Sequence, residues 1–346
     1  MMTHKLMALG PAVGAVAVLL AIAGLLTVTL TSPDGTDATP PESVDQAPAD
    51  SFDLQAAIDS ARPGAVIEIP DGTYTGPFRL DNKSQLVVRG SSSAILMAPG
   101  RDEILTIAGG SDITLSGFTV QGDYEHIPQR AITLQNVSDV TLTGLLIRDV
   151  GFAAVYAYPA ANLLVEDSTI THVGDFGVHS KEGSRNVVVR DSTLTGFASR
   201  LYPGHALYFQ NTQDAVAEGN YISDLPRGTG FDINAIQFDS VTGGRASNNV
   251  VERAVAGIGV PSSIDIAIVG NVIRDTYERA IYVFSGADRI SVRGNSMEEG
   301  VRGIQIIGGT NLRIVDNTTD RVDEPLDLGG GSRDGIVEQS GNSWQD

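Results

Sequence analysis

The 346-residue chain contains no cysteine, so neither disulfide bonds nor a thiolate metal site is available to hold its fold. Aromatic residues make up only 6% of the chain, with a single tryptophan, which favours a narrow core of Ile, Val, Leu and Ala. Positive charge is also scarce, because 23 Lys and Arg residues face 42 Asp and Glu residues. The net charge of -19 argues against a nucleic-acid partner, and an anionic substrate would need a local basic patch or a bound cation.

One long hydrophobic run, residues 6–30, follows His4 and Lys5 and contains no charged residue. A run of this length can span a bilayer of about 30 Å. We therefore expect residues 1–31 to form a membrane anchor with an extracytoplasmic C-terminal side, and a cleaved signal peptide of a secreted protein is the alternative. Residues 32–50 are rich in Pro, Asp and Thr, which predicts a disordered linker.

The remainder, residues 51–346, is predicted to be one repetitive domain. Aliphatic residues that each follow a small residue recur every 22 to 29 positions: Ile132, Val155, Val178, Leu207, Ile236, Ile258, Ile281 and Ile304. A second column keeps step with them: Ser168, Ser192, Asn220, Asn249, Asn271, Asn295, Asn317 and Asn342. Repeats of this length indicate a solenoid.

Within each repeat the apolar residues alternate with period two in short runs, which indicates strands rather than helices. Three short strands per repeat predict an all-β, single-chain parallel β-helix of about ten coils. The Asn column is interpreted as structural, with Asn in the left-handed corner conformation and side chains bonded along the axis. Ser51 is expected to cap a short helix that covers the first coil, and Trp344 to close the last.

The N-terminal part of this domain supports the same fold by resemblance. The segment from Leu54-Gln55-Ala56-Ala57-Ile58 through Pro63-Gly64 to Asp71-Gly72-Thr73-Tyr74 resembles the entry of right-handed parallel β-helix proteins of the pectate-lyase-like superfamily. The resemblance implies a right-handed coil. It leaves the activity open, because that superfamily includes lyases, hydrolases, epimerases and non-catalytic binders.

Three longer insertions locate the candidate site. The separation from the third strand of one coil to the first strand of the next is usually 7 or 8 residues, but it grows to 12, 13 and 14 around residues 121–130, 196–205 and 223–232. All three insertions fall at the same corner, so they should project from one side. The first two should be three coils apart, about 14 Å, and should form the end walls of a trough.

Alternation predicts which side chains face outward from the floor of that trough. They include Tyr156 and Tyr158, His179 and Lys181, and Tyr208 and Gln210, on successive coils. The residue before each inward aliphatic is always Ala or Gly, for example Ala154 and Gly177. This pattern has two interpretations, a corner open to a ligand or a corner too tight for anything larger.

The floor residues suggest proton chemistry on a sugar. Tyr156, His179 and Tyr208 should stack about 5 Å apart, with Lys181 beside His179 and His205 at the lip. Abstraction of a proton next to a uronate carboxylate requires a neutral base, a proton donor and a cation that neutralises the carboxylate. The expected catalytic residues are His179, Lys181, His205, Tyr208 and Tyr156. The expected substrate-binding residues are Tyr158, Arg200, Tyr202, Gln210, Arg227, Asp232, Gln237, Asp239, Tyr124, His126 and Arg130.

The neutralising cation could be Lys181, Arg200 or Arg227, or a Ca²⁺ ion held by Asp175 and Glu182. The coils also resemble those of mannuronan C5-epimerases and related alginate lyases, a resemblance that implies a role for His205, the one site position of the same residue type. Hydrolysis would need two carboxylates, for which Asp232 and Asp239 are the candidates. We expect a monomeric uronate lyase or C5-epimerase, and a non-catalytic carbohydrate-binding or surface-structural protein is the alternative.

Overall fold

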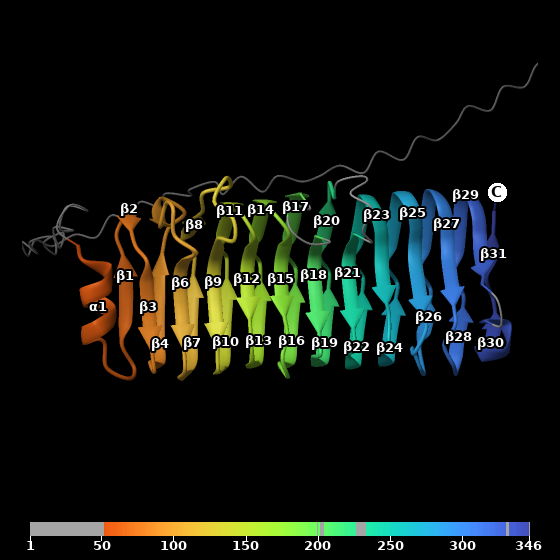
Figure 1. Ribbon diagram of the computed structural model, residues 1–346, viewed down its shortest axis with the longest axis horizontal. Helices are drawn as coiled ribbons and strands as arrows, with labels where there is room; N and C mark the ends of the chain where they lie inside the picture. The colour runs from red at the N-terminus through yellow and green to blue at the C-terminus, as the bar shows by residue number, and fades with distance from the viewer. Residues whose placement is uncertain (1–51, 199, 201–203, 226–232, 330–331, 346) are drawn as a thin grey trace, which may run out of the picture. The chain divides into compact units, whose positions relative to one another are not determined.

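The computed structural model describes residues 52–198, 200, 204–225, 233–329 and 332–345. In this part of the chain a parallel β-solenoid of about 11 turns follows one short helix (Figure 1). The predicted fold class is confirmed, with slightly more turns than expected. The predicted anchor or signal segment, residues 1–31, and the linker, residues 32–50, lie outside the described residues. No helix among the described residues is long and apolar enough to span a membrane.

Each turn contributes one strand to each of three columns of parallel strands. The first column contains β3 (Phe78–Asp81), β6 (Glu103–Ala108), β9 (Arg130–Gln135), β12 (Ala153–Ala157), β15 (Phe176–Ser180), β18 (His205–Gln210) and β21 (Asn234–Asp239). The second contains β1 (Val66–Ile69), β4 (Ser84–Gly90), β7 (Ser111–Ser116), β10 (Val137–Thr143), β13 (Ala160–Glu166), β16 (Arg185–Arg190), β19 (Gln213–Glu218), β22 (Thr242–Ser247), β24 (Ile264–Val269), β26 (Ser291–Arg293), β28 (Leu312–Val315) and β30 (Ile336–Ser340). The third contains β2 (Gly72–Thr75), β5 (Ala94–Met97), β8 (Thr119–Gln121), β11 (Leu146–Val150), β14 (Thr169–Val173), β17 (Thr193–Phe197), β20 (Tyr221–Ser223) and β31 (Ser343–Trp344).

In the C-terminal coils the third and first columns merge. Four long strands run through the corner without a break: β23 (Val250–Val260), β25 (Val272–Phe284), β27 (Ser296–Ile307) and β29 (Thr318–Leu328). The register of β23 and β25 shifts between Ala254 and Ala256, at the bend. These coils also lack the long corner insertions.

The core consists of stacked aliphatic side chains in register. Val155 pairs with Ile132 on one side and Val178 on the other, and all three are fully buried. Inward-facing Phe209 and Phe238 stack with ring centres 5.3 Å apart. Because every coil repeats the same inward positions, burial of one column stabilises the next coil along the axis.

The Asn column forms the predicted hydrogen-bonded ladder. The Oδ1 atom of Asn249 accepts a hydrogen bond from the backbone of Asn220 at 3.0 Å, and its Nδ2 donates to Asn271 at 2.9 Å. The expected backbone conformation was wrong by one position, because the left-handed residue precedes the column residue, as at Asn248 (φ 55°) and Gly270 (φ 65°). The buried Asn side chain therefore satisfies backbone groups exposed by the turn, and the turn itself is made by its neighbour.

Both ends of the solenoid are covered as predicted, with one correction. Helix α1 (Leu54–Ser60) buries Leu54 and Ile58 against the first coil. Its N-cap is Asp53, whose carboxylate accepts from the backbone of Ala56 at 2.9 Å, and not Ser51. An Asp side chain at this position satisfies an amide that the first helical turn leaves unpaired. Trp344 packs against the core at the other end.

Candidate active site

The three long insertions occupy the same corner, as predicted. They lie between β8 and β9, between β17 and β18, and between β20 and β21, that is, between a third-column and a first-column strand each time. Residues 199, 201–203 and 226–232 of the last two insertions lie outside the described residues, and with them Tyr202, Arg227 and Asp232. The coils between the insertions carry a cavity on the first column.

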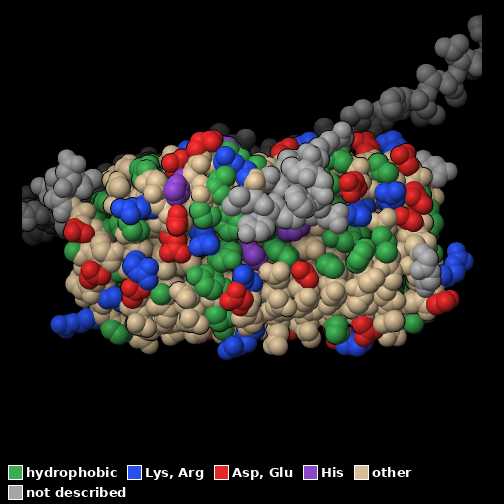
Figure 2. All heavy atoms as spheres, in the orientation of Figure 1, with side chains coloured by type: hydrophobic (Ala, Val, Ile, Leu, Met, Phe, Trp, Pro, Cys, Tyr) green, Lys and Arg blue, Asp and Glu red, His purple; other side chains and the backbone are tan. Residues whose placement is uncertain are grey.

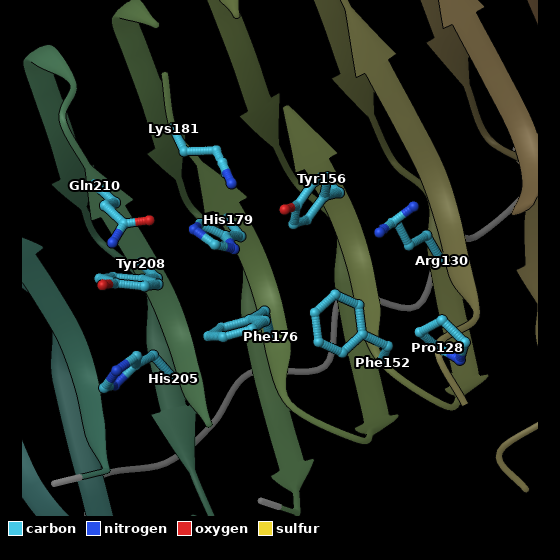
Figure 3. Close-up of a pocket in the computed structure, with 10 residues that line it drawn as sticks. All are labelled: Pro128, Arg130, Phe152, Tyr156, Phe176, His179, Lys181, His205, Tyr208 and Gln210. Carbon is cyan, nitrogen blue, oxygen red and sulfur yellow. The ribbon is translucent and has the colours of Figure 1, made fainter. Parts of the chain in front are cut away.

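This cavity, the floor pocket, has a volume of about 580 Å³. Side chains from four neighbouring coils line it, and Figure 3 shows them in three rows across the strands. The lining residues are Pro128, Arg130, Phe152, Tyr156, Phe176, His179, Lys181, His205, Tyr208 and Gln210. All five residues predicted to be catalytic are therefore brought together, with Arg130 and Gln210 from the predicted substrate-binding set.

The central row of the floor pocket has the predicted register. Tyr156 pairs with His179, and His179 pairs with Tyr208, on β12, β15 and β18. The rings of Tyr156 and His179 meet edge to face at 5.0 Å, and those of His179 and Tyr208 stack at 4.6 Å. Spacing close to 5 Å follows from parallel strand pairing, so residues far apart in the chain become direct neighbours.

Two phenylalanines that the sequence analysis missed form a second row beside the central one. The rings of Phe152 and Phe176 meet edge to face at 5.4 Å, and Phe176 lies 4.6 Å from His179 and 5.6 Å from Tyr208. Together with Tyr156 they give the floor pocket an apolar lining. Such faces bind the apolar side of a sugar ring.

Strict alternation fails here because the strand bends at its small residue. Gly177 faces the core like Val178, since a Cβ atom on it would meet the core residues Leu194 and Phe197, and Phe176 before it lines the pocket. A Cβ atom on Gly177 would come within 2.4 Å of the Ala206 carbonyl oxygen. Ala154 and Ala206 are fully buried in the same column. The small residues thus mark a tight corner, and the interpretation of a corner open to a ligand is wrong.

His179 is the most unusual group in the floor pocket. Its side chain is 5% exposed, and neither ring nitrogen has a hydrogen-bond partner among the described residues. Burial first, and then the positive charge of Lys181, lower its pKa to about 3. Gln210 lies close enough to oppose this shift but makes no well-formed hydrogen bond with the ring. His179 is therefore a neutral imidazole at physiological pH, with its lone pair uncommitted.

His205 is buried at 5% exposure, and the expectation that it lies at the lip was wrong. The bend at Ala206 turns it into the same row as Phe176. Its Nδ1 atom accepts a hydrogen bond from the backbone of Asn234 at 3.0 Å, so the ring proton of the neutral form is on Nε2. Burial lowers its pKa to about 3.

Tyr208 is held by an acidic partner outside the pocket lining. Its hydroxyl donates to Oδ2 of Asp239 at 2.9 Å. Burial and then the charge of Asp239 raise the pKa of Tyr208, so the phenol stays protonated. Asp239 was predicted to contact substrate, and it instead fixes the ring of Tyr208 in this structure.

Two cations flank the central row. The guanidinium of Arg130 lies 4.5 Å from the ring centre of Tyr156, and the ammonium of Lys181 lies 5.8 Å from the same ring on the other side. Lys181 pairs with Glu182 at 2.9 Å, which together with Tyr156 raises the pKa of Lys181. A protonated Lys181 cannot accept a proton, so of the two functions open to a catalytic lysine, base or neutralising cation, its raised pKa favours the cation.

Tyr124, His126 and Arg200 were predicted to bind substrate but lie away from the floor pocket lining, at the corner. Arg200 donates to the carbonyl of Tyr124 and lies 4.6 Å from its ring. Tyr124 also stacks on His172 at 3.8 Å, and His126 contacts Asp102 at 3.2 Å. The first two insertions therefore touch through Arg200, and the open trough between separate walls was a wrong prediction.

The remaining predicted positions are arranged as follows. Tyr158 meets the ring of Tyr156 at 5.3 Å, beside the pocket. Gln237 is buried and accepts from Asn234 and Tyr282 at 2.7 and 3.0 Å. Its carboxamide oxygen is thus occupied by protein donors.

The suggested Ca²⁺ pair is not assembled. Asp175 precedes β15 and Glu182 follows it, so the five residues of that strand, about 16 Å of extended chain, lie between the two. Asp175 accepts from the backbone of Arg200 at 2.7 Å, while Glu182 pairs with Lys181. Within the described ranges, no cluster of three or more His, Asp or Glu residues could hold a metal ion.

Comparison with known proteins agrees with this architecture. The family model described as "Right handed beta helix region" matches residues 130–319, which is more than half of the chain. The chain belongs to the right-handed β-helix family. The residues matched by the family model include every residue that lines the floor pocket except Pro128. No curated protein sequence matches the chain significantly.

Solved structures with this β-helix fold are similar in shape and distant in sequence. A periplasmic alginate epimerase superposes with a TM-score of 0.60 at 12% identity, covering 85% of this chain and 83% of its own. An α-1,3-glucanase from Streptomyces thermodiastaticus gives 0.57 at 16% identity, with 84% of this chain and 66% of the glucanase covered. The surface adhesin PfbA of Streptococcus pneumoniae gives 0.60 at 13%, with 86% and 94% covered. Identities this low establish the shared fold alone.

Proposed function

We propose that this β-helix protein acts on a uronate-containing polysaccharide by abstracting the proton at C5, as a lyase or C5-epimerase. The observation that carries the proposal is the buried, neutral and unbonded imidazole of His179, placed between an aromatic floor and two cations. Two of the structural neighbours are named for enzymes of polysaccharides, which supports the same substrate class.

In this proposal each side chain of the floor pocket has a role. A sugar ring lies on Phe152 and Phe176, and its carboxylate is held between Arg130 and Lys181 over the ring of Tyr156. Neutralising the carboxylate stabilises the enolate-like anion that forms when C5 loses its proton. His179 accepts this proton. Lyase chemistry then breaks the C4–O4 bond, forms the C4=C5 double bond and protonates O4, whereas an epimerase returns a proton to the opposite face of C5.

Substrate binding also changes the pKa of the base, His179. The charge of Lys181 is the second cause of the low pKa of His179, after burial. A carboxylate bound to Lys181 offsets that charge, and this raises the pKa of His179 toward the range useful for a base. Tyr156 is the phenol positioned to donate, because the hydroxyl of Tyr208 is committed to Asp239 and the phenol pKa of Tyr208 is raised.

The test is an assay of the full-length protein with alginate, polygalacturonate and hyaluronan in deuterated and ordinary water. Absorbance of the unsaturated product reports elimination, and deuterium at C5 reports epimerisation. We expect His179→Gln to lower kcat by a factor of about 10² to 10⁴, the usual contribution of a general base. Lys181→Met should raise KM as well, because it removes a carboxylate contact.

His172→Gln is the matched control, since His172 is a half-exposed histidine on β14 outside the floor pocket. It should keep wild-type activity. The absence of both unsaturated product and deuterium uptake with every uronate polymer would overturn the catalytic proposal. An unchanged rate in His179→Gln would overturn it as well.

A non-catalytic carbohydrate-binding protein is the second candidate. The aromatic lining favours it, because four aromatic side chains of the floor pocket offer stacking surface without any proton transfer: Phe152, Tyr156, Phe176 and Tyr208. Saturable binding without turnover, weakened by Tyr156→Ala, would establish this function. In both cases we propose that the β-helix works outside the cytoplasm, on the basis of the apolar run in residues 1–31.

A further inference from the structure

The outermost row of the floor pocket does not end with the pocket. Lys181 and Gln210 belong to a column in which Gln210 pairs with Asp239 and Phe284 pairs with Ile307. Pro261 lies between these two pairs, since Ser240 donates to its carbonyl and Val260 pairs with Val283. The column thus changes from polar to apolar as it passes from the pocket toward the C-terminal coils, where Figure 2 shows hydrophobic side chains on the same face.

Phe284 is the unusual member of this column. It is 43% exposed, and with the partly exposed Pro261 and Ile307 on either side it forms a continuous apolar strip. The other exposed large hydrophobics of the described residues, Val66, Tyr221, Val301 and Val337, lie on the second or third column or at a corner.

The coil beneath Phe284 is rigidly built. Tyr282, two residues earlier, is 4% exposed and donates to Gln237 at 3.0 Å. Its ring crosses the position of Gly259, where a Cβ atom would come within 2.5 Å of the tyrosine. A side chain at Gly259 would displace the ring of Tyr282. The glycine therefore lets this ring pack flat against the strand between the pocket and Phe284.

We propose that Phe284, with Pro261 and Ile307 beside it, is a distal sugar-binding subsite for the same polysaccharide chain. The proposal rests on the function proposed above and adds the direction of the chain, along the solenoid axis toward the C-terminal coils. Gln210 and Phe284 are three strand spacings apart, about 14 Å, a span of two or three sugar rings. Asp239 lies within this span, where its carboxylate accepts hydrogen bonds from Tyr208 and Ser240.

The test uses the full-length protein and uronate oligosaccharides of increasing length. Phe284→Ala should raise KM by about three- to tenfold for oligosaccharides long enough to reach from the pocket to Phe284, the usual value of one aromatic contact. The kcat should stay unchanged, because Phe284 touches no reacting group. Oligosaccharides of two units should show no change, and Phe284→Trp should retain wild-type KM.

Val301→Ala is the matched control, because it removes an exposed apolar side chain at the corner of β27. It should alter KM at no length. An unchanged KM for long oligosaccharides in Phe284→Ala, or an equal rise for short ones, would overturn the subsite. Calorimetric binding separates the two proposals: long oligosaccharides bound without turnover, and weakened by Phe284→Ala, support the subsite and refute catalysis. A wild-type protein that binds no uronate oligosaccharide refutes both.

Discussion

At the scale of single residues, the floor pocket carries a cost in stability. His179 and His205 are both buried and neutral, with pKa values lowered to about 3 from an ordinary value of 6.5. Such histidines lower the free energy of unfolding as the pH falls, because they bind protons in the unfolded chain and stay unprotonated in the folded protein. Groups with strongly shifted pKa values cluster at functional sites, which agrees with the role proposed for this pocket.

The pH dependence of unfolding tests this cost. Between about pH 3 and 6.5 the unfolded state binds the extra protons, so the free energy of unfolding should rise with pH across this window and level off above it. Each histidine contributes up to about 1.4 kcal/mol per pH unit. His179→Gln and His205→Gln should each flatten the rise seen in urea unfolding at a series of pH values.

A full slope in both pocket variants would show that the two imidazoles are protonated in the folded protein.

At the scale of the strand and its corner, the Asn ladder replaces the disulfides that the chain lacks. Asn271 accepts from the backbone and side chain of Asn249 at 3.0 and 2.9 Å and donates to Ala246 and Asn295 at 2.9 Å. Asn271→Ala leaves these buried groups unpaired, so the free energy of unfolding should fall by about 2 to 4 kcal/mol.

Asn271→Ser should cost clearly less, because a hydroxyl can accept from the preceding coil. Ser192 does this in the same column, accepting from the backbone of Ser168 at 3.2 Å. The midpoint of urea unfolding measures both variants, and equal losses for Ala and Ser would refute the ladder as the source of stability.

The strand scale also shows how far sequence reasoning reaches. The period-two pattern placed Tyr156, His179 and Tyr208 on one wall, because register in a parallel sheet follows directly from repeat spacing. It missed Phe176 and misplaced His205, because both precede a bend where two successive residues face the core. Contacts between insertions, such as Arg200 with Tyr124, depend on loop conformations that have no period, so the sequence could not predict them.

At the scale of the whole solenoid, the strands of each described coil pair only with those of the adjacent coils along the axis (Figure 1). Stability should therefore be local, with each coil depending on the coil before and after it. The floor pocket spans four coils in the middle of this array, between helix α1 at one end and Trp344 at the other. A central position protects the pocket from fraying of the ends.

Ile58→Ala tests this locality. Ile58 is 1% exposed and fills the contact of α1 with the first coil, so its truncation should cost about 2 to 4 kcal/mol at that end. Because strand pairing links only adjacent coils, amide hydrogen exchange should accelerate in α1 and β1–β3 while β15 and β18 keep their protection. Activity on uronate polymers should be retained. If protection instead falls equally in every coil, the solenoid opens as a single cooperative unit, and the pocket gains nothing from its central position.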